Sequence, residues 1–330
     1  MLKLFLYCFR VFDEKEYFEE LCKLHDFTYG YTSDYPTIEN ANLAKGYDGI
    51  SVTPTMLNAE LLEKFHSLGV RYILTRSIGY DHIDMRKANE LGLQVSHVKY
   101  RPEAVADYAV MLMMMSLRKM RLIMEQTSIQ DFSLSGKIGR NIGDCTIGVV
   151  GTGQIGQTVI KHLSAFGCRI LAYAPYVNTE ITSLCEYVPL QQLYKECDVI
   201  TLHVPATDSN YHLLNHSAFN SMKSGAIIIN TARGTLIDTE ALIAALENGQ
   251  IGGAALDVLE DEGGLYFINR VGDCIANRQL AILRSFPNVI LTPHTAFYTE
   301  NVVRGMAEST IECLFDMADK RKNPLIISNS

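Results

Sequence analysis

The sequence lacks an excess of positive charge, and this absence excludes two classes of partner. Its 330 residues carry 29 Lys and Arg against 37 Asp and Glu, a formal net charge of -8. Such a chain offers no basic face to nucleic acid or to an acidic membrane surface. A small anionic substrate would have to be held by one well-placed cationic group, because the overall field repels it.

Paired cysteines and long apolar runs are also missing. The eight cysteines form no CxxC pair and no Cys/His spacing typical of a metal site, which indicates reduced thiols and no bound metal. The apolar run at 1–9 ends at Arg10 without a small-residue cleavage site, so we interpret it as a strand and not a signal peptide. The run at 109–117 is about half a membrane span. We therefore expect a cytoplasmic protein with no membrane contact.

Short apolar runs alternate with segments of helical periodicity, a pattern typical of α/β proteins with parallel sheets. Helical stretches such as residues 58–68 place their apolar residues on one face. At this length two domains are expected. We predict two doubly wound parallel sheets, with strands at 2–8, 27–31, 49–52, 72–75 and 94–97 in the first, and at 145–150, 169–173, 199–204, 226–230, 254–259 and 289–292 in the second.

One expected helix is apolar nearly all round. Residues 103–120 contain no Gly or Pro and are rich in Ala, Met and Leu. Such a helix must be covered on most sides, by another domain or by a second subunit. We expect it to form the contact of a homodimer. From about residue 300 the sequence predicts a further helix and then a polar tail.

A glycine-rich turn, GTGQIG at 151–156, joins an expected strand to an amphipathic helix. Strand, turn, helix and second strand follow one another in the order of a dinucleotide-binding unit, which a ligand-free glycine turn would not require. Gly151 permits the tight turn, Gly153 lets a pyrophosphate approach the backbone, and Gly156 allows the helix to pack closely on the strand. The phosphates would lie on N–H groups at the start of the helix.

The second strand of this unit ends without the acidic residue that usually holds the adenosine ribose. Residues 169–173 are followed by Ala174, Pro175 and Tyr176, and the first acidic residue is Glu180. No Arg stands there to receive a 2′-phosphate. We expect NAD as the cofactor, and the motif leaves NADP open.

Five blocks together resemble the D-2-hydroxyacid dehydrogenases, in order and over essentially the whole chain. They are TRSIGYDHID (75–84), GVVGTGQIG (148–156), NTARGTLID (230–238), AALDVLEDE (254–262) and LTPHTAFYT (291–299). Within that family the last block is most similar to D-lactate and D-2-hydroxyisocaproate dehydrogenases, above all the D-lactate dehydrogenases of vancomycin-resistance operons. The resemblance implies an oxidoreductase that passes a hydride between NAD(P)H and a small 2-keto acid such as pyruvate, with D stereochemistry. It also implies a flavodoxin-like substrate domain at 1–100 and 300–330, and a Rossmann cofactor domain at 101–299.

Three catalytic residues are implied by the resemblance. Arg233 follows an expected strand and would hold the substrate carboxylate, because a guanidinium fits a carboxylate in a two-pronged geometry. His294 would donate a proton to the carbonyl oxygen, since imidazole titrates near neutral pH. Glu262 would bond to His294 and favour its charged form. The family spacing from Asp257 selects Glu262 over Glu260 and Asp261, and makes Glu260 either structural or a residue that supports the catalytic groups. The other eight histidines are interpreted as structural.

The same resemblance assigns residues to the two ligands. Cofactor contacts are expected from Gly151, Gly153, Gln154, Ile155, Gly156, Val204, Pro205, Thr231, Ala232 and Asp257, and substrate contacts from Ile78, Gly79, Tyr100, Phe297 and Tyr298. For the three aromatic residues, ordinary core packing is nearly as good an interpretation. Two alternative functions stay open: a reductase of a larger branched-chain or aromatic 2-keto acid, and a dinucleotide-sensing co-regulator on the same fold, for which the short polar tail leaves little room.

Overall fold

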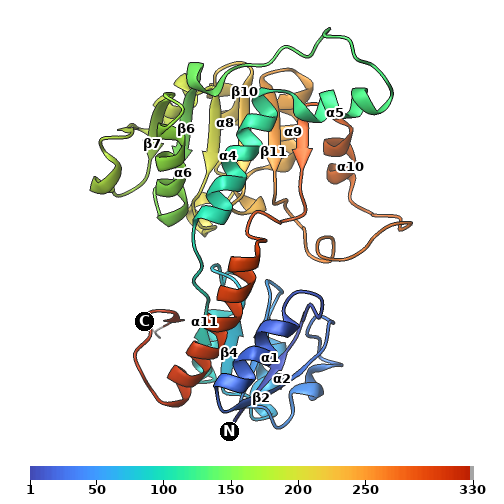
Figure 1. Cartoon of the computed structure of the whole chain (residues 1–330), viewed down its shortest axis with the longest axis vertical. Coiled ribbons are helices and arrows are strands. Elements are labelled where there is room, and N and C mark those ends of the chain that lie inside the picture. The colour runs from blue at the N-terminus through green and yellow to red at the C-terminus, as the bar shows by residue number, and fades with distance from the viewer. Residues whose placement is uncertain (328–330) are drawn as a thin grey trace. The chain divides into compact units, whose positions relative to one another are not determined.

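The computed structural model describes residues 1–327, and the chain divides into two compact units (Figure 1). Unit 1 consists of Met1–Arg101 and Tyr298–Ser330, and unit 2 of Pro102–Phe297. Each unit holds a mainly parallel sheet with helices, so the predicted α/β class is confirmed. Among the described residues, no helix combines the length and the apolar character needed to cross a membrane.

Unit 1 is built on a six-stranded sheet in the order β13-β5-β4-β3-β1-β2. Without β13 this is the doubly wound order of flavodoxin-like sheets, in which ligands bind at the carboxyl ends of the strands. The strands are β1 (Leu2–Leu6), β2 (Phe27–Tyr31), β3 (Gly49–Val52), β4 (Tyr72–Thr75), β5 (Gln94–Ser96) and β13 (Ile326–Ile327). The helices are α1 (Lys15–Leu24), η1 (Ala41–Ala44), α2 (Ala59–Ser67), α3 (Met85–Glu90) and α11 (Glu300–Ala318).

The prediction of a polar tail after the last helix is wrong in one respect, because this segment contains a strand. β13 pairs antiparallel with β5, Ile326 with Ser96 and Ile327 with Val95, and adds a sixth strand to the five that were expected. A strand of two residues is too short to show alternation, so only the return of the chain to the sheet edge reveals it.

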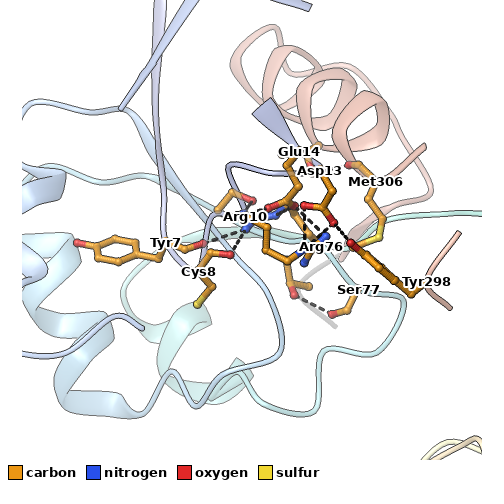
Figure 2. Close-up of polar contacts among 12 residues, drawn as sticks. Tyr7, Cys8, Arg10, Asp13, Glu14, Arg76, Ser77, Tyr298 and Met306 are labelled. Atoms are coloured by element: carbon orange, nitrogen blue, oxygen red, sulfur yellow. Dashed lines mark hydrogen bonds and ion pairs between the residues drawn. The ribbon is translucent and has the colours of Figure 1, made fainter. Parts of the chain in front are cut away.

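A buried ionic network lies at the carboxyl ends of β1 and β4 in unit 1 (Figure 2). The Arg76 side chain is 0% exposed and donates to Glu14 Oε1 at 2.8 Å, to Ser51 Oγ at 3.0 Å, and to the carbonyl oxygens of Tyr7 and Cys8 at 2.9 and 3.2 Å. An unpaired buried guanidinium would be strongly destabilising, so these partners are required for burial. The network fixes the loop after β4 relative to the loop after β1.

Unit 2 holds a seven-stranded parallel sheet in the order β12-β11-β10-β9-β6-β7-β8. When the strands are numbered within the unit from β6 as the first, the order from β8 to β12 is 3-2-1-4-5-6-7. This is the order of dinucleotide-binding sheets, and its switch point lies between β6 and β9. The strands are β6 (Thr146–Val150), β7 (Arg169–Tyr173), β8 (Glu186–Tyr187), β9 (Val199–Leu202), β10 (Ala226–Asn230), β11 (Ile251–Leu256) and β12 (Val289–Leu291). The longer helices are α4 (Glu103–Leu117), α5 (Met120–Ser128), α6 (Gln154–Ser164), α7 (Leu190–Glu196), α8 (His216–Ser221), α9 (Thr239–Glu247) and α10 (Arg278–Ser285).

Two apolar clusters cover the two faces of this sheet. Successive residues of β10 alternate between them, with Ile228 in one cluster and Ile227 and Ile229 in the other. A strand buried on both faces reads as a continuous apolar run, which is why the central strands were located from the sequence.

The helix expected at 103–120 is α4, which begins as expected and ends three residues earlier, and a second helix follows it. α4 ends at Leu117, and α5 begins at Met120 after Lys119, whose φ of +52° is left-handed. The Leu117 carbonyl accepts the Arg140 N–H at 3.0 Å, and Gly139 passes so close that a Cβ there would lie 2.7 Å from the same oxygen. The returning chain therefore ends the helix, and local composition could not show this contact.

The strand expected at 254–259 is β11, which begins and ends three residues earlier. Its second and third residues, Gly252 and Gly253, lie before the predicted start. At Gly253 a Cβ would lie 2.7 Å from the Asn288 carbonyl, so the approach of the neighbouring chain requires the glycine.

Candidate active site

Three polar side chains follow three neighbouring strands of unit 2. Arg233 comes after β10, Glu262 after β11 and His294 after β12. β11 pairs in parallel with both β10 and β12, so the carboxyl ends of the three strands meet at the same edge of the sheet. This edge is where open α/β sheets bind their ligands.

His294 and Glu262 form a hydrogen-bonded pair. His294 Nδ1 lies 2.6 Å from Glu262 Oε1, and Glu262 Oε2 accepts the Leu259 N–H at 3.0 Å. The two side chains are 17% and 28% exposed, so water screens their interaction less than it would on an open surface. The other ring nitrogen, Nε2, takes no part in this pair, and its role as proton donor stays a prediction.

Glu260, two residues before Glu262, is held by other partners. Its Oε1 lies 2.7 Å from His212 Nε2, and its Oε2 accepts the Thr239 N–H and hydroxyl at 2.9 and 2.6 Å. The geometry therefore favours Glu262 over Glu260 as the partner of His294.

Asp257 holds the loop that carries His294. Its carboxylate accepts the Thr292 hydroxyl at 2.6 Å and the Thr295 and Ala296 N–H groups at 2.9 Å, and its carbonyl accepts the His294 N–H at 2.8 Å. The residue is 0% exposed, and a carboxylate is stable there only with such donors. His294 has a left-handed φ of +54°, which this loop maintains. A contact of Asp257 with the cofactor stays a prediction.

Arg233 is positioned by the turn after β10. Asn230 braces this turn, because its Nδ2 donates to the Arg233 carbonyl at 2.8 Å and its Oδ1 accepts the Ala232 N–H at 3.0 Å. At Gly234 any Cβ would overlap the Leu259 carbonyl, so only glycine fits. This close approach places the Arg233 turn beside the loop that carries Glu262.

Two aromatic rings flank the His294 imidazole. The Phe297 ring lies 6.2 Å away at 84°, the Phe267 ring lies 5.9 Å away, and the two phenyl rings are 6.3 Å apart. Phe297 was among the predicted residues, whereas Phe267 was missed because its loop has no periodic pattern. The left-handed φ of Phe267, +64°, is unusual for a bulky residue. The Tyr266-Phe267 pair in a glycine-containing loop was the only sequence feature that pointed to it.

The glycine turn after β6 has the form of a phosphate cradle. Gly151 has a φ of +96°, and Gly156 packs so closely that a Cβ would overlap the Gly151 carbonyl. At Gly153 a Cβ meets no atom within 4 Å, and no side chain caps the helix that begins there. Gln154 and Ile155 are the first two residues of α6, so their N–H groups begin the helix beside open space. The turn therefore fits a pyrophosphate.

The other predicted cofactor residues follow β9 and β10. Val204 lies against Gly151, because a Cβ on that glycine would be 2.8 Å from Val204 Cγ1, and the Pro205 carbonyl accepts Asn210 Nδ2 at 2.7 Å. The buried Thr231 hydroxyl makes no hydrogen bond within the described part of the chain. Such a group is destabilising unless a ligand supplies its partner, so this side chain also fits a bound dinucleotide.

The end of β7 lies beside the glycine turn, since the Tyr173 carbonyl accepts the Gly151 N–H at 2.8 Å. Ala174 follows, and its methyl group can neither accept a hydrogen bond from a ribose hydroxyl nor repel a phosphate. The structure thus places Ala174 where the sequence motif expects the ribose-binding carboxylate.

Four predicted substrate residues belong to unit 1. Ile78 and Gly79 follow β4, where the Ser77 hydroxyl donates to the Gly79 carbonyl at 2.6 Å. The Tyr298 hydroxyl donates to Asp13 Oδ2 at 2.5 Å (Figure 2), and burial together with this contact raises the pKa of Tyr298 to about 12. Tyr100 is half-buried. Substrate contacts of all four residues stay predictions.

Comparison with known proteins gives one consistent family. Residues 110–296 match the family model described as D-isomer specific 2-hydroxyacid dehydrogenase, NAD binding domain. The chain is 40% identical to an aromatic 2-oxoacid reductase of Clostridium sporogenes over 98% of each chain, and 40% identical to a D-lactate dehydrogenase of Lactiplantibacillus plantarum over 89% of this chain and 90% of the other. The NAD-complexed D-isomer specific 2-hydroxyacid dehydrogenase of Lactobacillus delbrueckii ssp. bulgaricus superposes with a TM-score of 0.84 at 30% identity, over 99% and 100% of the two chains.

Proposed function

This chain belongs to the family of D-isomer-specific 2-hydroxyacid dehydrogenases, and within it we propose that the chain reduces a small 2-keto acid such as pyruvate to the D-2-hydroxy acid. One observation carries the proposal. A guanidinium, Arg233, and a hydrogen-bonded acid pair, His294 and Glu262, stand at the carboxyl ends of three adjacent strands. A carboxylate anchor and a proton donor are the two groups that reduction of a 2-keto acid demands of the protein.

Each group has a distinct role in the reaction. Bound NADH supplies the hydride. Arg233 binds the substrate carboxylate through two parallel hydrogen bonds and so fixes the keto group in one orientation. His294 Nε2 donates its proton to the carbonyl oxygen as negative charge develops there, and the same nitrogen accepts the proton in the reverse direction. Glu262 keeps the ring in place through Nδ1 and stabilises the imidazolium that precedes transfer.

The cofactor is held by the residues of the cradle. The first N–H groups of α6 bind the pyrophosphate, with Gly153 allowing its close approach. Thr231, through its hydroxyl, and Ala232, both at the end of β10, would also contact the dinucleotide. These assignments rest on the open space at Gly153 and on the buried hydroxyl of Thr231.

A larger substrate is the second candidate, and one observation favours it. The Phe267 and Phe297 rings beside His294 would pack well against a branched or aromatic side chain. One of the similar proteins is named for aromatic 2-oxo acids and another for D-lactate. Pyruvate, 4-methyl-2-oxopentanoate and phenylpyruvate should therefore be compared as substrates, with NADH and with NADPH.

The test combines this substrate panel with analysis of the product. We expect NADH oxidation with all three acids, highest kcat/KM for pyruvate, and D-lactate by chiral chromatography. Formation of L-lactate would contradict the proposal. Arg233→Lys should lower kcat/KM for pyruvate by orders of magnitude with NADH affinity little changed, because the two-pronged contact is lost. Arg86→Lys, at an exposed position on α3, is the matched control.

We propose further that the protein is a cytoplasmic homodimer formed through α4. Met111 and Met114 on this helix are 41% and 42% exposed and line a hollow of about 760 Å³ together with residues at and just after the end of α6. Leu134 and Ile138, in the extended segment after α5 (Figure 1), are 88% and 85% exposed. Apolar surface of this extent is typical of an interface. Sedimentation of the wild type and of Met114→Glu tests the dimer, which the variant should weaken.

The unpaired cysteines support the proposed cytoplasmic location, because thiols stay reduced there, and cell fractionation tests it.

A further inference from the structure

A second histidine–glutamate pair lies next to the first. His212 Nε2 is 2.7 Å from Glu260 Oε1, and the two side chains are 27% and 15% exposed. Glu260 lies two residues before Glu262, which pairs with His294. One short loop after β11 therefore carries the acidic partner of both histidines.

Glu260 ties this loop to the rest of unit 2. Its Oε2 accepts both the N–H and the hydroxyl of Thr239, the first residue of α9, so both carboxylate oxygens are occupied. The next residue, Asp261, has a left-handed φ of +54°. The loop turns sharply there, and a displacement of Glu260 would pass directly to Glu262.

The backbone of His212 lies alongside the turn of Arg233. Its N–H donates to the Thr235 carbonyl at 2.9 Å, and the N–H of Leu214 donates to the Leu236 carbonyl at 3.0 Å. Thr235 comes two residues after Arg233. His212 thus contacts the Arg233 turn through its backbone and the Glu262 loop through its ring.

The His212 ring is held on several sides. Tyr211 stacks on it at 3.9 Å and 18°, and Asp238 Oδ2 lies 3.8 Å from Nδ1, opposite Glu260. Its φ of +50° is left-handed. A residue remains in such a conformation only where its surroundings determine it, and such residues are concentrated at functional sites. The ring therefore has one orientation, directed at Glu260.

We propose that His212 is a positioning residue of the reaction: through Glu260 it fixes the loop that carries Glu262, and thereby the orientation of the His294 ring. His212 acts on the reaction only through Glu260 and the Glu262 loop, and it takes no part in proton transfer. The inference rests on the roles proposed above for His294 and Glu262. Its physical basis is that a small displacement of a proton donor lowers the rate steeply.

Two substitutions separate the hydrogen bond from the packing of the ring. His212→Ala removes the donor to Glu260, and we expect kcat for pyruvate reduction to fall about 10- to 100-fold, with KM and NADH affinity little changed. His212→Gln keeps a side-chain donor and should recover most of the lost kcat. His216→Ala, at an exposed position at the start of α8, is the matched control and should retain wild-type kcat.

A double-mutant cycle with Glu262→Ala distinguishes positioning from a purely structural role, because Ala removes the acceptor of the His294 ring. If His212 acts through Glu262, adding His212→Ala to Glu262→Ala lowers kcat no further, whereas independent effects multiply. Thermal unfolding of each variant confirms that it is folded. Should His212→Ala not fold, Glu260→Gln takes its place in the cycle.

Multiplicative losses, or wild-type kcat in a folded His212→Ala protein, would overturn the proposal while leaving the proposed function intact. Wild-type kcat in Glu262→Ala alone would instead overturn the role of Glu262, and that of His212 with it. A non-multiplicative cycle with rescue by Gln supports the proposal.

Discussion

Glu260 and Glu262 show how two carboxylates in one loop acquire different roles. Each pairs with a histidine, at 2.7 and 2.6 Å. The second oxygen of Glu260 accepts from the first residue of α9, whereas the second oxygen of Glu262 accepts the Leu259 N–H of its own loop. Spacing could select Glu262 only through the family resemblance, because the partners come from segments about 30 and 50 residues away in the chain.

The role of Glu262 predicts a specific loss of turnover. Glu262 Oε1 lies 2.6 Å from Nδ1 of His294, and its negative charge stabilises the positive charge of the ring that donates the proton. Glu262→Gln keeps an oxygen that can accept from Nδ1 and removes the charge, so kcat for pyruvate reduction should fall by about tenfold or more, with KM little changed. Steady-state kinetics measure the loss, with the exposed Glu247→Gln as control. Wild-type kcat in Glu262→Gln would contradict the assignment.

At Ala174 the prediction concerns the choice between NADH and NADPH. A carboxylate at this position would accept hydrogen bonds from the ribose and repel a 2′-phosphate, and alanine does neither. We expect weak discrimination in the wild type, and a gain in NADH preference of about tenfold, ~1–2 kcal/mol, in Ala174→Asp, because solvent screens the charges. The measurement is the ratio of kcat/KM for the two cofactors, and Ala174→Asn separates hydrogen bonding from charge. Strong NADH selectivity in the wild type with no gain in the Asp variant would show that another residue holds the ribose.

At the scale of the element, the glycine turn before α6 separates ligand binding from packing. A Cβ at Gly153 meets open space, whereas one at Gly156 overlaps the Gly151 carbonyl. Gly153→Ala should therefore raise the KM for NADH at least tenfold without lowering the thermal midpoint. Gly156→Ala should destabilise the protein by about 1–3 kcal/mol. Calorimetry and NADH titration of both variants test this, and the reverse pattern would remove the turn from the cofactor site.

Elements fixed by local pattern were predictable, and those fixed by distant contacts were not. β10 was located from its apolar run, and the β6–α6 unit from its glycines. The end of α4 depends on Arg140, which is distant in sequence, and β13 depends on the edge of β5. Strand periodicity carries no information about such partners.

The same division applies to the candidate site. Arg233 and His294 stand in motifs directly after apolar strands, at the edge where open α/β sheets bind ligands, and the family resemblance assigned their roles. Phe267 and His212 lie in loops, and their contacts with His294 and Glu260 arise only from the fold. A lone histidine in a loop has no pattern that would distinguish it from the other histidines.

On the scale of the whole molecule, the chain passes from unit 2 back to unit 1 between Phe297 and Tyr298. Hydrogen bonds hold the chain on each side of this point. Asp257 holds the chain within unit 2 as far as Ala296, and Asp13 holds it within unit 1 from Tyr298. Only Phe297 lies between the two anchors. The residue that flanks the His294 ring is therefore also the last residue of unit 2.

The stability of the molecule should depend on pH through one half-buried histidine of unit 2. His203 follows β9, and its Nε2 lies 2.8 Å from the hydroxyl of the buried Thr201. Burial lowers the pKa of His203 to about 3, whereas a free imidazole titrates near ~6.5. Between these values the unfolded chain binds a proton that the folded chain does not.

The contribution of His203 to the free energy of unfolding should therefore be complete above pH ~6.5. It should decrease as the pH falls toward about 3, by up to ~1.4 kcal/mol per pH unit. His203→Gln keeps a polar group beside Thr201 and removes the titration. Between pH ~7 and ~5, where most carboxylates stay ionised, the wild type should lose about 1–2 kcal/mol more than this variant. Urea unfolding at each pH measures the difference, and His216→Gln, at an exposed position, should behave as the wild type. Equal losses in the wild type and in His203→Gln would show that His203 is protonated in the folded protein.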